Sequence, residues 1–139
     1  MNTAAATRLA PEAYLVEGPA AARLAFRFTP ATVRALVPAR ICGTYLLLDG
    51  ENPVYVGRSD ACLRTRLASH NHRSSATHVL WEPARSPKNA YLLEAHWFHQ
   101  HDLQLNQIHP ASPAGQSLSC PFCDPLLIPA LHYAFGHAA

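Results

Sequence analysis

The sequence predicts a small α/β (α+β) domain in which a three-stranded, mainly antiparallel sheet is flanked by helices. An Asp-Gly pair at 49–50 lies between two short apolar runs, which is a strong hairpin signal. A third apolar run at 77–81 predicts another strand. Ser/Thr-Pro pairs at 29–30 and 86–87 have the pattern of a helix N-cap followed by proline at the first helical position.

The remaining elements follow from turn signals and helical spacing. Leu63 and Leu67 lie four residues apart and predict one buried helix face. On the last helix, Glu94 shares a broad face with aromatic residues, where a carboxylate needs a partner. The expected order is an irregular segment at 1–22, a strand at 24–28, a helix at 30–37, hairpin strands at 43–48 and 53–57, a helix from 59 or 60 to about 70, a strand at 77–81 and a helix at about 87–101.

The composition is that of one ordinary globular domain. The 139 residues are 49% hydrophobic and 14% charged, which argues against bulk disorder. The net charge of +2 permits a polyanionic partner without indicating one. Residues 1–13 lack the apolar core of a signal peptide, and no apolar stretch reaches the roughly 18 residues of a membrane span. Four cysteines are too few for a disulfide framework, so we expect a cytoplasmic protein with reduced thiols and no membrane association.

The chain divides into three regions. Residues 1–40 are expected to form an N-terminal extension with a short strand and a helix, and residues 41–108 the core. Residues 109–139 are a proline-rich tail, where five prolines between 110 and 129 predict irregular structure. We expect no internal repeat and no second domain.

Two tyrosine-glycine triplets, Gly43-Thr44-Tyr45 and Tyr55-Val56-Gly57, lie ten residues apart. A hairpin would bring the two tyrosines near each other, beside a glycine that lets a ligand approach the backbone. Downstream follow Arg58, the segment 66–70, Glu94 and, twelve residues later, Asn106. Over about residues 41–108 these motifs together resemble the GIY-YIG nuclease superfamily. They are similar in layout to the nuclease domain of the bacterial excision-repair subunit that makes the first incision.

The resemblance implies a divalent-metal-dependent endonuclease that hydrolyses phosphodiester bonds in DNA, with RNA as an open alternative. It also implies one metal held by one glutamate, and Glu94 is a hard oxygen ligand suited to Mg²⁺ or Mn²⁺. Arg66 can pair with a phosphate in bidentate fashion. We favour Arg66 over Arg64 as the family arginine because Arg66 and His70 are four residues apart and share a helix face.

The other matched residues have roles around the phosphate. Tyr45 or Tyr55 would hold the attacking water and help deprotonate it, although a phenol with its unperturbed pKa near 10 needs a nearby cation to act as a base. His70 can assist that deprotonation, and Asn106 would orient the site through its amide. The expected substrate contacts are Gly57, Arg58 and Arg64.

Other functions stay open. The same fold can serve as a non-catalytic module that binds nucleic acid or another protein, and a toxin or effector nuclease would share the chemistry. The complete set of catalytic residue types favours catalysis. Because the chain has no room for a separate recognition domain, it would depend on a protein partner, on substrate structure or on low specificity.

A second candidate site is the C-x2-C turn of Cys120 and Cys123, which has the bite for a structural Zn²⁺. His109 is the most attractive third ligand because its loop can return to Cys120, and His132, His137 and Cys42 are alternatives. Two reduced cysteines in a tail turn remain the competing interpretation. His101 is expected to be structural, and the expected surface histidines are His72, His78, His96 and His99.

Overall fold

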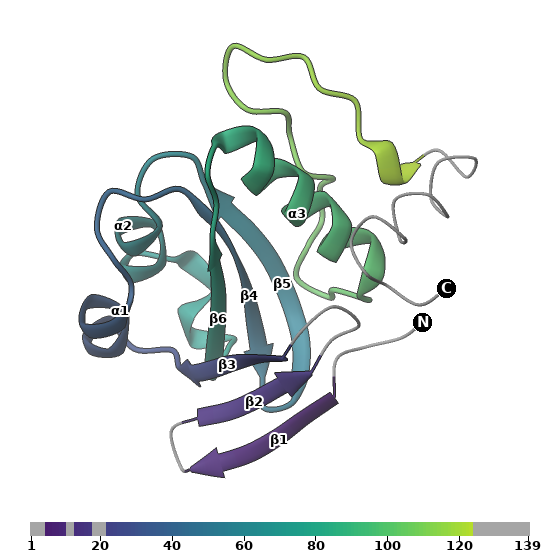
Figure 1. Cartoon of the computed structure of the whole chain (residues 1–139). Coiled ribbons are helices and arrows are strands. Elements are labelled where there is room, and N and C mark those ends of the chain that lie inside the picture. The colour runs from purple at the N-terminus through teal and green to yellow at the C-terminus, as the bar shows by residue number, and fades with distance from the viewer. Residues whose placement is uncertain (1–4, 11–12, 18–21, 124–139) are drawn as a thin grey trace.

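The computed structural model describes residues 5–10, 13–17 and 22–123 of the chain. These residues form a mixed α/β structure around an antiparallel sheet with the strand order β1-β2-β3-β6-β4-β5 (Figure 1). The strands are β1 (Ala5–Ala10), β2 (Ala13–Glu17), β3 (Ala22–Arg27), β4 (Gly43–Asp49), β5 (Asn52–Ser59) and β6 (His78–Pro83).

Strands β4 and β5 form the predicted hairpin, and its register pairs Tyr45 with Gly57. Gly50 in the turn has a φ of 61°, a left-handed conformation that favours glycine. The N–H of Gly50 donates to Thr77 Oγ1 at 2.7 Å, which ties the turn to the entry of β6. Strand β6 pairs antiparallel with β4. The prediction of a mixed α/β structure with an antiparallel sheet is confirmed.

The sheet is larger than the three strands expected. Strand β3, expected from the sequence outside the core, pairs with β6, and β1 and β2 extend the same sheet. The two outer strands fall in the segment that we expected to be irregular. Three of the six residues of β1 are alanine, which has low intrinsic strand propensity, and the strand-forming residues Tyr14, Leu15 and Val16 of β2 make only a short run. Both strands exist through backbone pairing with neighbours that local sequence does not reveal.

Two helices begin where the Ser/Thr-Pro pairs predict. The hydroxyl of Thr29 caps α1 (Pro30–Leu36), and that of Ser86 caps α3 (Pro87–Gln100), each by accepting a backbone N–H. Proline follows both caps at the first helical position, where its missing N–H costs nothing.

Helix α2 (Leu63–Ala68) begins later than expected. The Ser59 hydroxyl accepts the N–H of Cys62 at 3.0 Å, so it closes a turn before the helix instead of capping it. Leu63 and Leu67 are fully buried, as their spacing predicts. A short 3₁₀ turn, η1 (Asn71–Ser74), follows and is capped by the side chain of His70.

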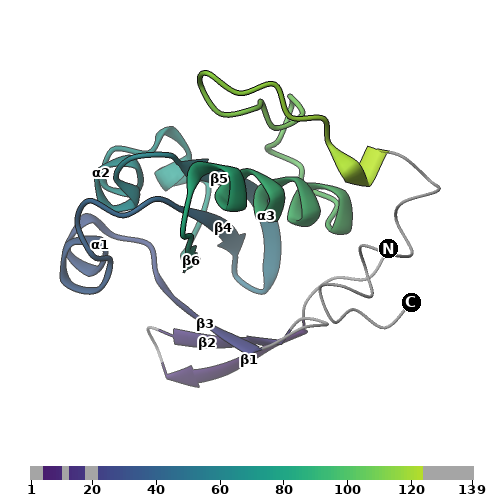
Figure 2. The ribbon, with the colours of Figure 1, turned by 45° about the horizontal axis from the view of Figure 1, so that its top comes forward.

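The sheet carries a core on each face, because successive side chains of a strand point to opposite sides. On one face, Tyr45 and Leu47 of β4 pack with residues of α1 and α2. On the other face, Leu46 and Leu48 pack with Leu103 and with aromatic residues of α3. Figure 2 shows α3 lying along β4 and β5, while α1 and α2 lie together away from it.

The chain that follows α3 covers the outer edge of β5 and then the outside of the helix. The N–H of Leu105 donates to Val54 O at 2.9 Å, so this segment runs beside the edge strand. The chain then passes over α3 to the 3₁₀ turn η2 (Pro121–Cys123) (Figure 1). Phe122 in this turn is buried. Among the residues described, no helix is both long and apolar enough to cross a membrane.

Candidate functional site

Two basic side chains hold Tyr45 at the centre of the predicted site. Tyr45 lies on β4 and is fully buried, and its Oη is 2.5 Å from Nε2 of His70. Arg66, exposed on α2, donates from Nε to the same oxygen at 3.5 Å. The pKa of Arg66 is raised mainly by this hydrogen bond, with a smaller contribution from Tyr55. The structure therefore brings four predicted residues together at one face of the sheet.

The protonation of His70 follows from its hydrogen bonds. Its Nδ1 accepts the backbone N–H of His72 at 3.0 Å, so the neutral imidazole carries its proton on Nε2 and donates it to Tyr45. Burial lowers the pKa of His70 to about 4, and the charge of Arg66 adds to this shift. Burial raises the pKa of Tyr45 well above its usual range, although the hydrogen bond from Arg66 opposes the shift. Both groups are therefore neutral at pH 7.

Gly57 is explained by the close approach of Tyr45. The two residues are opposite each other in the hairpin, and a Cβ at Gly57 would lie 2.6 Å from Cζ of Tyr45 and 3.0 Å from Cε2 of Tyr55. No side chain fits at these distances without displacing a ring. The space that glycine leaves is filled by the Tyr45 phenol, so packing against tyrosine accounts for this residue.

Tyr55 is the accessible tyrosine of the pair. Its ring centre lies 5.2 Å from that of His70 and 4.7 Å from that of His72. A hollow of about 230 Å³ opens beside these rings and is also lined by Arg66. A neighbouring hollow of about 250 Å³ shares Tyr55 and His72 and includes residues 105–108. His72, expected only as a surface residue, thus lines both hollows. Its position two residues after His70 was the only feature of the sequence that could have indicated this role.

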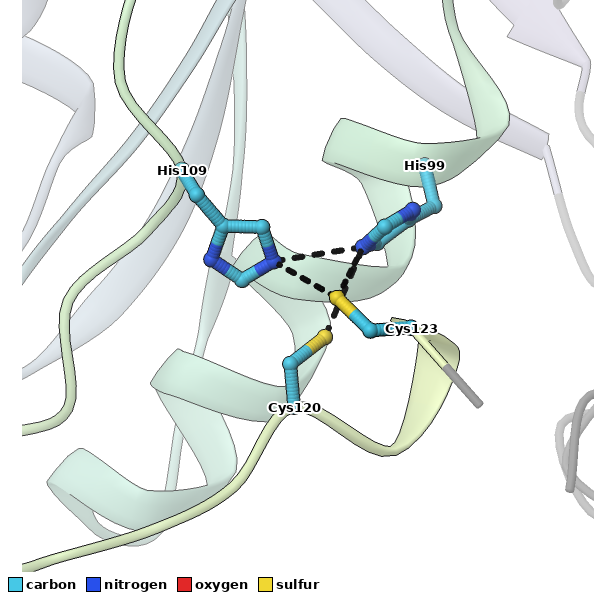
Figure 3. Close-up of side chains that lie close together, drawn as sticks. All are labelled: His99, His109, Cys120 and Cys123. Atoms are coloured by element: carbon cyan, nitrogen blue, oxygen red, sulfur yellow. Dashed lines mark hydrogen bonds between the residues drawn. The ribbon is translucent and has the colours of Figure 1, made fainter. Parts of the chain in front are cut away.

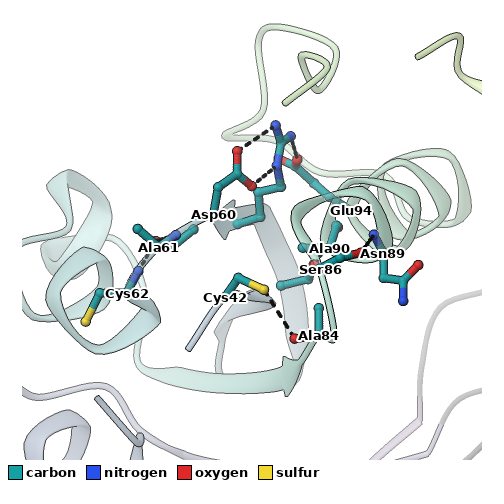
Figure 4. Close-up of polar contacts among 12 residues, drawn as sticks. Cys42, Asp60, Ala61, Cys62, Ala84, Ser86, Asn89, Ala90 and Glu94 are labelled. Atoms are coloured by element: carbon teal, nitrogen blue, oxygen red, sulfur yellow. Dashed lines mark hydrogen bonds and ion pairs between the residues drawn. The ribbon is translucent and has the colours of Figure 1, made fainter. Parts of the chain in front are cut away.

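Glu94 lies on α3 and is 8% exposed. Arg58 donates from Nη1 to Glu94 Oε1 at 2.6 Å and from Nε to Asp60 Oδ1 at 2.8 Å (Figure 4). Burial raises the pKa of Glu94 above its usual value, and the hydrogen bond from Arg58 acts in the opposite direction. The guanidinium also lies 5.3 Å from the ring centre of Tyr91. Arg58 is therefore the partner that a carboxylate on an aromatic helix face requires.

The edge strand β5 separates these two groups of residues. Tyr55 contacts the histidines after α2, whereas Arg58 contacts Glu94 on α3. In the part of the chain that is described, no hydrogen bond joins Arg66 to Glu94. The charge of Arg66 nevertheless lowers the pKa of Glu94, so the two groups are within electrostatic reach of each other.

Asn106 binds the outer edge of β5. Its Oδ1 accepts the N–H of Val56 at 2.8 Å, and its Nδ2 donates to the C=O of Val56 at 3.0 Å. The side-chain amide thus replaces a neighbouring strand at a position next to Gly57. Both of its polar groups are used in this way, so Asn106 acts on the site through the backbone of β5.

Arg64 lies apart from the residues around Tyr45. Its Nε donates to Val37 O at 2.7 Å, where α1 ends. The contact with α1 gives Arg64 a structural role that its spacing in the sequence does not indicate. The geometry around Tyr45 therefore includes Arg66 and not Arg64.

A second cluster gathers at the C-terminal end of α3 and is formed by His99, His109, Cys120 and Cys123 (Figure 3). Their ligand atoms lie within 4.8 Å of one another. This group can bind a metal ion such as zinc, for which imidazole and thiolate are the usual ligands. Three of the four residues were expected from the sequence, and the fourth member of the cluster is His99.

The alternative ligands do not join this cluster in the structure. Cys42 donates from Sγ to Ala84 O at 3.2 Å, on another part of the molecule (Figure 4). His132 and His137 lie outside the described residues. His99 was expected as a surface residue and is indeed exposed, but its Nε2 also lies 3.4 Å from Sγ of Cys123 in η2.

Two further histidines expected at the surface are buried, and this prediction is wrong. His78 is 4% exposed because β6 lies between β3 and β4. His96 is 3% exposed because η2 covers it, with the ring of Phe122 at 5.0 Å. The local sequence does not predict that these histidines are buried, because the segments that bury them are distant in the chain.

Comparisons of the chain with protein-family models, with curated proteins and with solved structures found no match. The interpretation of both clusters therefore rests on the geometry described above.

Proposed function

We propose that the protein is a divalent-metal-dependent endonuclease that hydrolyses phosphodiester bonds in DNA, as do the GIY-YIG nucleases that its motifs resemble. The observation that carries the proposal is the contact of Arg66 and His70 with Tyr45, beside a hollow onto which Tyr55 opens. Phosphodiester hydrolysis requires a group that accepts a proton from water and positive charge for the phosphate. Groups of both kinds lie around this hollow.

The two tyrosines have different roles in this proposal because only one of them is accessible. Tyr55 lines both hollows and is the phenol that contacts the attacking water in this proposal. Tyr45 is fully buried and is a positioning residue that holds Arg66 and His70. The Arg66 side chain is exposed, and its terminal nitrogens pair with the phosphate oxygens.

The donor set around Glu94 fits one lightly held divalent cation. Among the described residues, the hydrogen bond to its carboxylate comes from Arg58 and involves Oε1, so Oε2 is left for a metal. Mg²⁺ and Mn²⁺ keep several waters and need only one or two protein carboxylates. When bound, such an ion supplies positive charge to the phosphate and to the leaving oxygen. Its charge also favours the ionised form of Glu94, whose burial favours the neutral form.

The Arg58–Glu94 ion pair favours a second candidate, a module that binds nucleic acid without cutting it. An arginine at 2.6 Å neutralises the carboxylate that a metal would need. In this alternative, exposed Arg66 contacts phosphates while the Tyr55 and His72 rings contact bases.

The two candidates are separated by incubating purified protein with supercoiled plasmid and with single-stranded, duplex, flap and junction substrates. The nuclease proposal predicts cleavage with Mg²⁺ or Mn²⁺ that stops in EDTA and is lost in Glu94→Ala, with the circular dichroism spectrum unchanged. Substrate retention without cleavage, unaffected by metal, would establish the binding module and overturn the nuclease. Cleavage by Glu94→Ala at the wild-type rate would remove the metal role of Glu94.

A further inference from the structure

We propose that His99, His109, Cys120 and Cys123 form a closed tetrahedral Zn²⁺ site that fastens the segment after α3 to the helix. The site is distinct from the proposed nuclease site and does not depend on it. Its ligands come from three separate parts of the described chain: the last turn of α3, the loop near residue 109, and the turn η2. Figure 3 shows all four side chains directed toward one point.

The distances between the ligand atoms fit zinc. With Zn–N near 2.0–2.1 Å and Zn–S near 2.3 Å, tetrahedral geometry requires N–N separations of about 3.3 Å and N–S separations of about 3.6 Å. The two imidazole Nε2 atoms are 3.2 Å apart. Sγ of Cys123 lies 3.4 Å from each of them, and Sγ of Cys120 lies 3.5 Å from Nε2 of His99. These four separations agree with tetrahedral zinc to within a few tenths of an ångström. The other two, from Sγ of Cys120 to Sγ of Cys123 and to Nε2 of His109, are within 4.8 Å.

A hydrogen bond outside the cluster sets one ligand in the form that a metal needs. His109 donates from Nδ1 to Pro110 O at 2.9 Å, so its Nε2 carries the lone pair. Backbone carbonyls commonly orient metal-binding imidazoles in this way. Two nitrogens and two thiolate sulfurs complete four-coordination and leave no position for substrate, which is the pattern of a structural site.

The location of the ligands indicates what the ion would hold. Residues 102–120 form neither helix nor strand, so few backbone contacts fix this long connection. The site joins the middle of this connection, at His109, and its end, at Cys120, to α3, the helix that carries Glu94. His109 lies three residues after Asn106. Phe122, between the two cysteines, is buried against His96. Zinc would therefore stabilise both the turn η2 and the approach of Asn106 to β5.

The test is the metal content of the full chain, purified without chelator and measured by inductively coupled plasma mass spectrometry. We expect one zinc per chain in the wild type and in the control Cys62→Ser, a cysteine outside the cluster. We expect less than a tenth of an equivalent in His99→Ala and Cys120→Ser. His99→Cys replaces an imidazole with a thiolate, which is also a usual zinc ligand, and should restore binding, which a merely structural role for His99 would not do.

Cobalt substitution supplies a readout that does not depend on stability. Co²⁺ added to the chelator-treated protein should give the thiolate charge-transfer bands and intense d–d bands of a tetrahedral site, and His99→Cys should shift them. Zinc content that is unchanged in Cys120→Ser would overturn the proposal. So would a wild-type chain that contains no zinc and binds neither zinc nor cobalt under reducing conditions, or one in which Cys120 and Cys123 resist reduction as a disulfide.

Discussion

At the scale of single residues, the two tyrosines of the triplets occupy different environments although their motifs are alike. Tyr45 has no exposed surface and two basic neighbours, whereas Tyr55 is half-buried and forms part of two hollows. The hydroxyl of Tyr45 accepts hydrogen bonds from His70 and Arg66, and burial keeps it protonated. Of the two tyrosines, only Tyr55 reaches the hollows, where the proposed nuclease would bind its substrate and the attacking water.

Replacing each tyrosine with phenylalanine tests this division. Tyr55→Phe should lower the plasmid-nicking rate by roughly 100-fold or more, because proton transfer in the transition state is lost. Tyr45→Phe should reduce the rate by less than about tenfold and reduce the free energy of unfolding by about 1–3 kcal/mol, because His70 loses a buried acceptor. Initial nicking rates and urea denaturation of both variants measure these effects. The opposite ranking of the two rates would assign the base to Tyr45.

Substitution of Gly57 should affect stability and the site together. In Gly57→Ala the added Cβ meets the Tyr45 ring, so we expect a loss of about 1–3 kcal/mol in the free energy of unfolding and a large loss of nicking activity. Gly50→Ala is the control: its Cβ would meet no atom within 4 Å, but φ is 61°, so stability falls while activity is kept. Full activity in Gly57→Ala would show that Tyr45 has room to move.

At the scale of elements, the edge of β5 depends on one side chain. Asn106 satisfies both backbone groups of Val56, so Asn106→Ala should speed hydrogen exchange of the Val56 amide by about tenfold or more. Exposed Gln107→Ala is the matched control and should leave that exchange unchanged. The measurement is amide exchange followed by NMR. Equal protection in both variants would mean that β5 is held without the Asn106 amide.

Elements signalled by nearby residues could be predicted, and those that depend on distant partners could not. The hairpin at 49–50 and the capped starts of α1 and α3 arise from local turn and cap chemistry. Strand β1 pairs with β2 and β2 pairs with β3, and the sequence pattern of residues 1–22 does not show these partners. The predicted start of α2 was too early because the Ser59 hydroxyl accepts the N–H of Cys62 in a turn before the helix.

The same difference applies to the candidate site. The sequence groups Arg66 with His70 through a shared helix face, but α2 ends at Ala68 and His70 caps η1. The turn after the helix therefore brings His70 to Tyr45 beside Arg66. The ion pair of Arg58 with Glu94 and the contact of Arg64 with α1 depend on how α3 and α1 dock, which spacing does not determine. His99 was missed because the other members of its cluster come from distant parts of the chain, and the sequence does not show that residues 109–123 fold back onto α3.

At the scale of the whole molecule, stability should depend on pH through two buried histidines. Burial lowers the pKa of His101 to about 4, and the same holds for His70. Both pKa values are below the usual 6.5, so between about 4 and 6.5 the unfolded chain binds more protons. The contribution of His70 to the free energy of unfolding is therefore fully present above pH 6.5. It falls by about 1–3 kcal/mol as the pH drops toward 4. Glu94, whose pKa is raised by burial, opposes this loss as the pH approaches the carboxylate range.

The variant His70→Asn checks this assignment. Its Oδ1 can replace Nδ1 as the acceptor for the N–H of His72, but asparagine does not titrate. Urea denaturation at a series of pH values should show a shallower slope for the variant than for the wild type between pH 4 and 6.5. Parallel slopes would show that His70 titrates normally in the folded protein.

The central claim is that Glu94 supports metal-dependent cleavage of a phosphodiester bond. The most direct measurement is the initial rate of plasmid nicking in Mn²⁺ for the wild type, Glu94→Gln and the exposed control Glu51→Gln. Glutamine keeps the size of the side chain but removes the charged ligand, so Glu94→Gln should be slower by roughly 100-fold or more while Glu51→Gln equals the wild type. Equal rates for all three proteins, or nicking by the wild type in EDTA, would contradict the account.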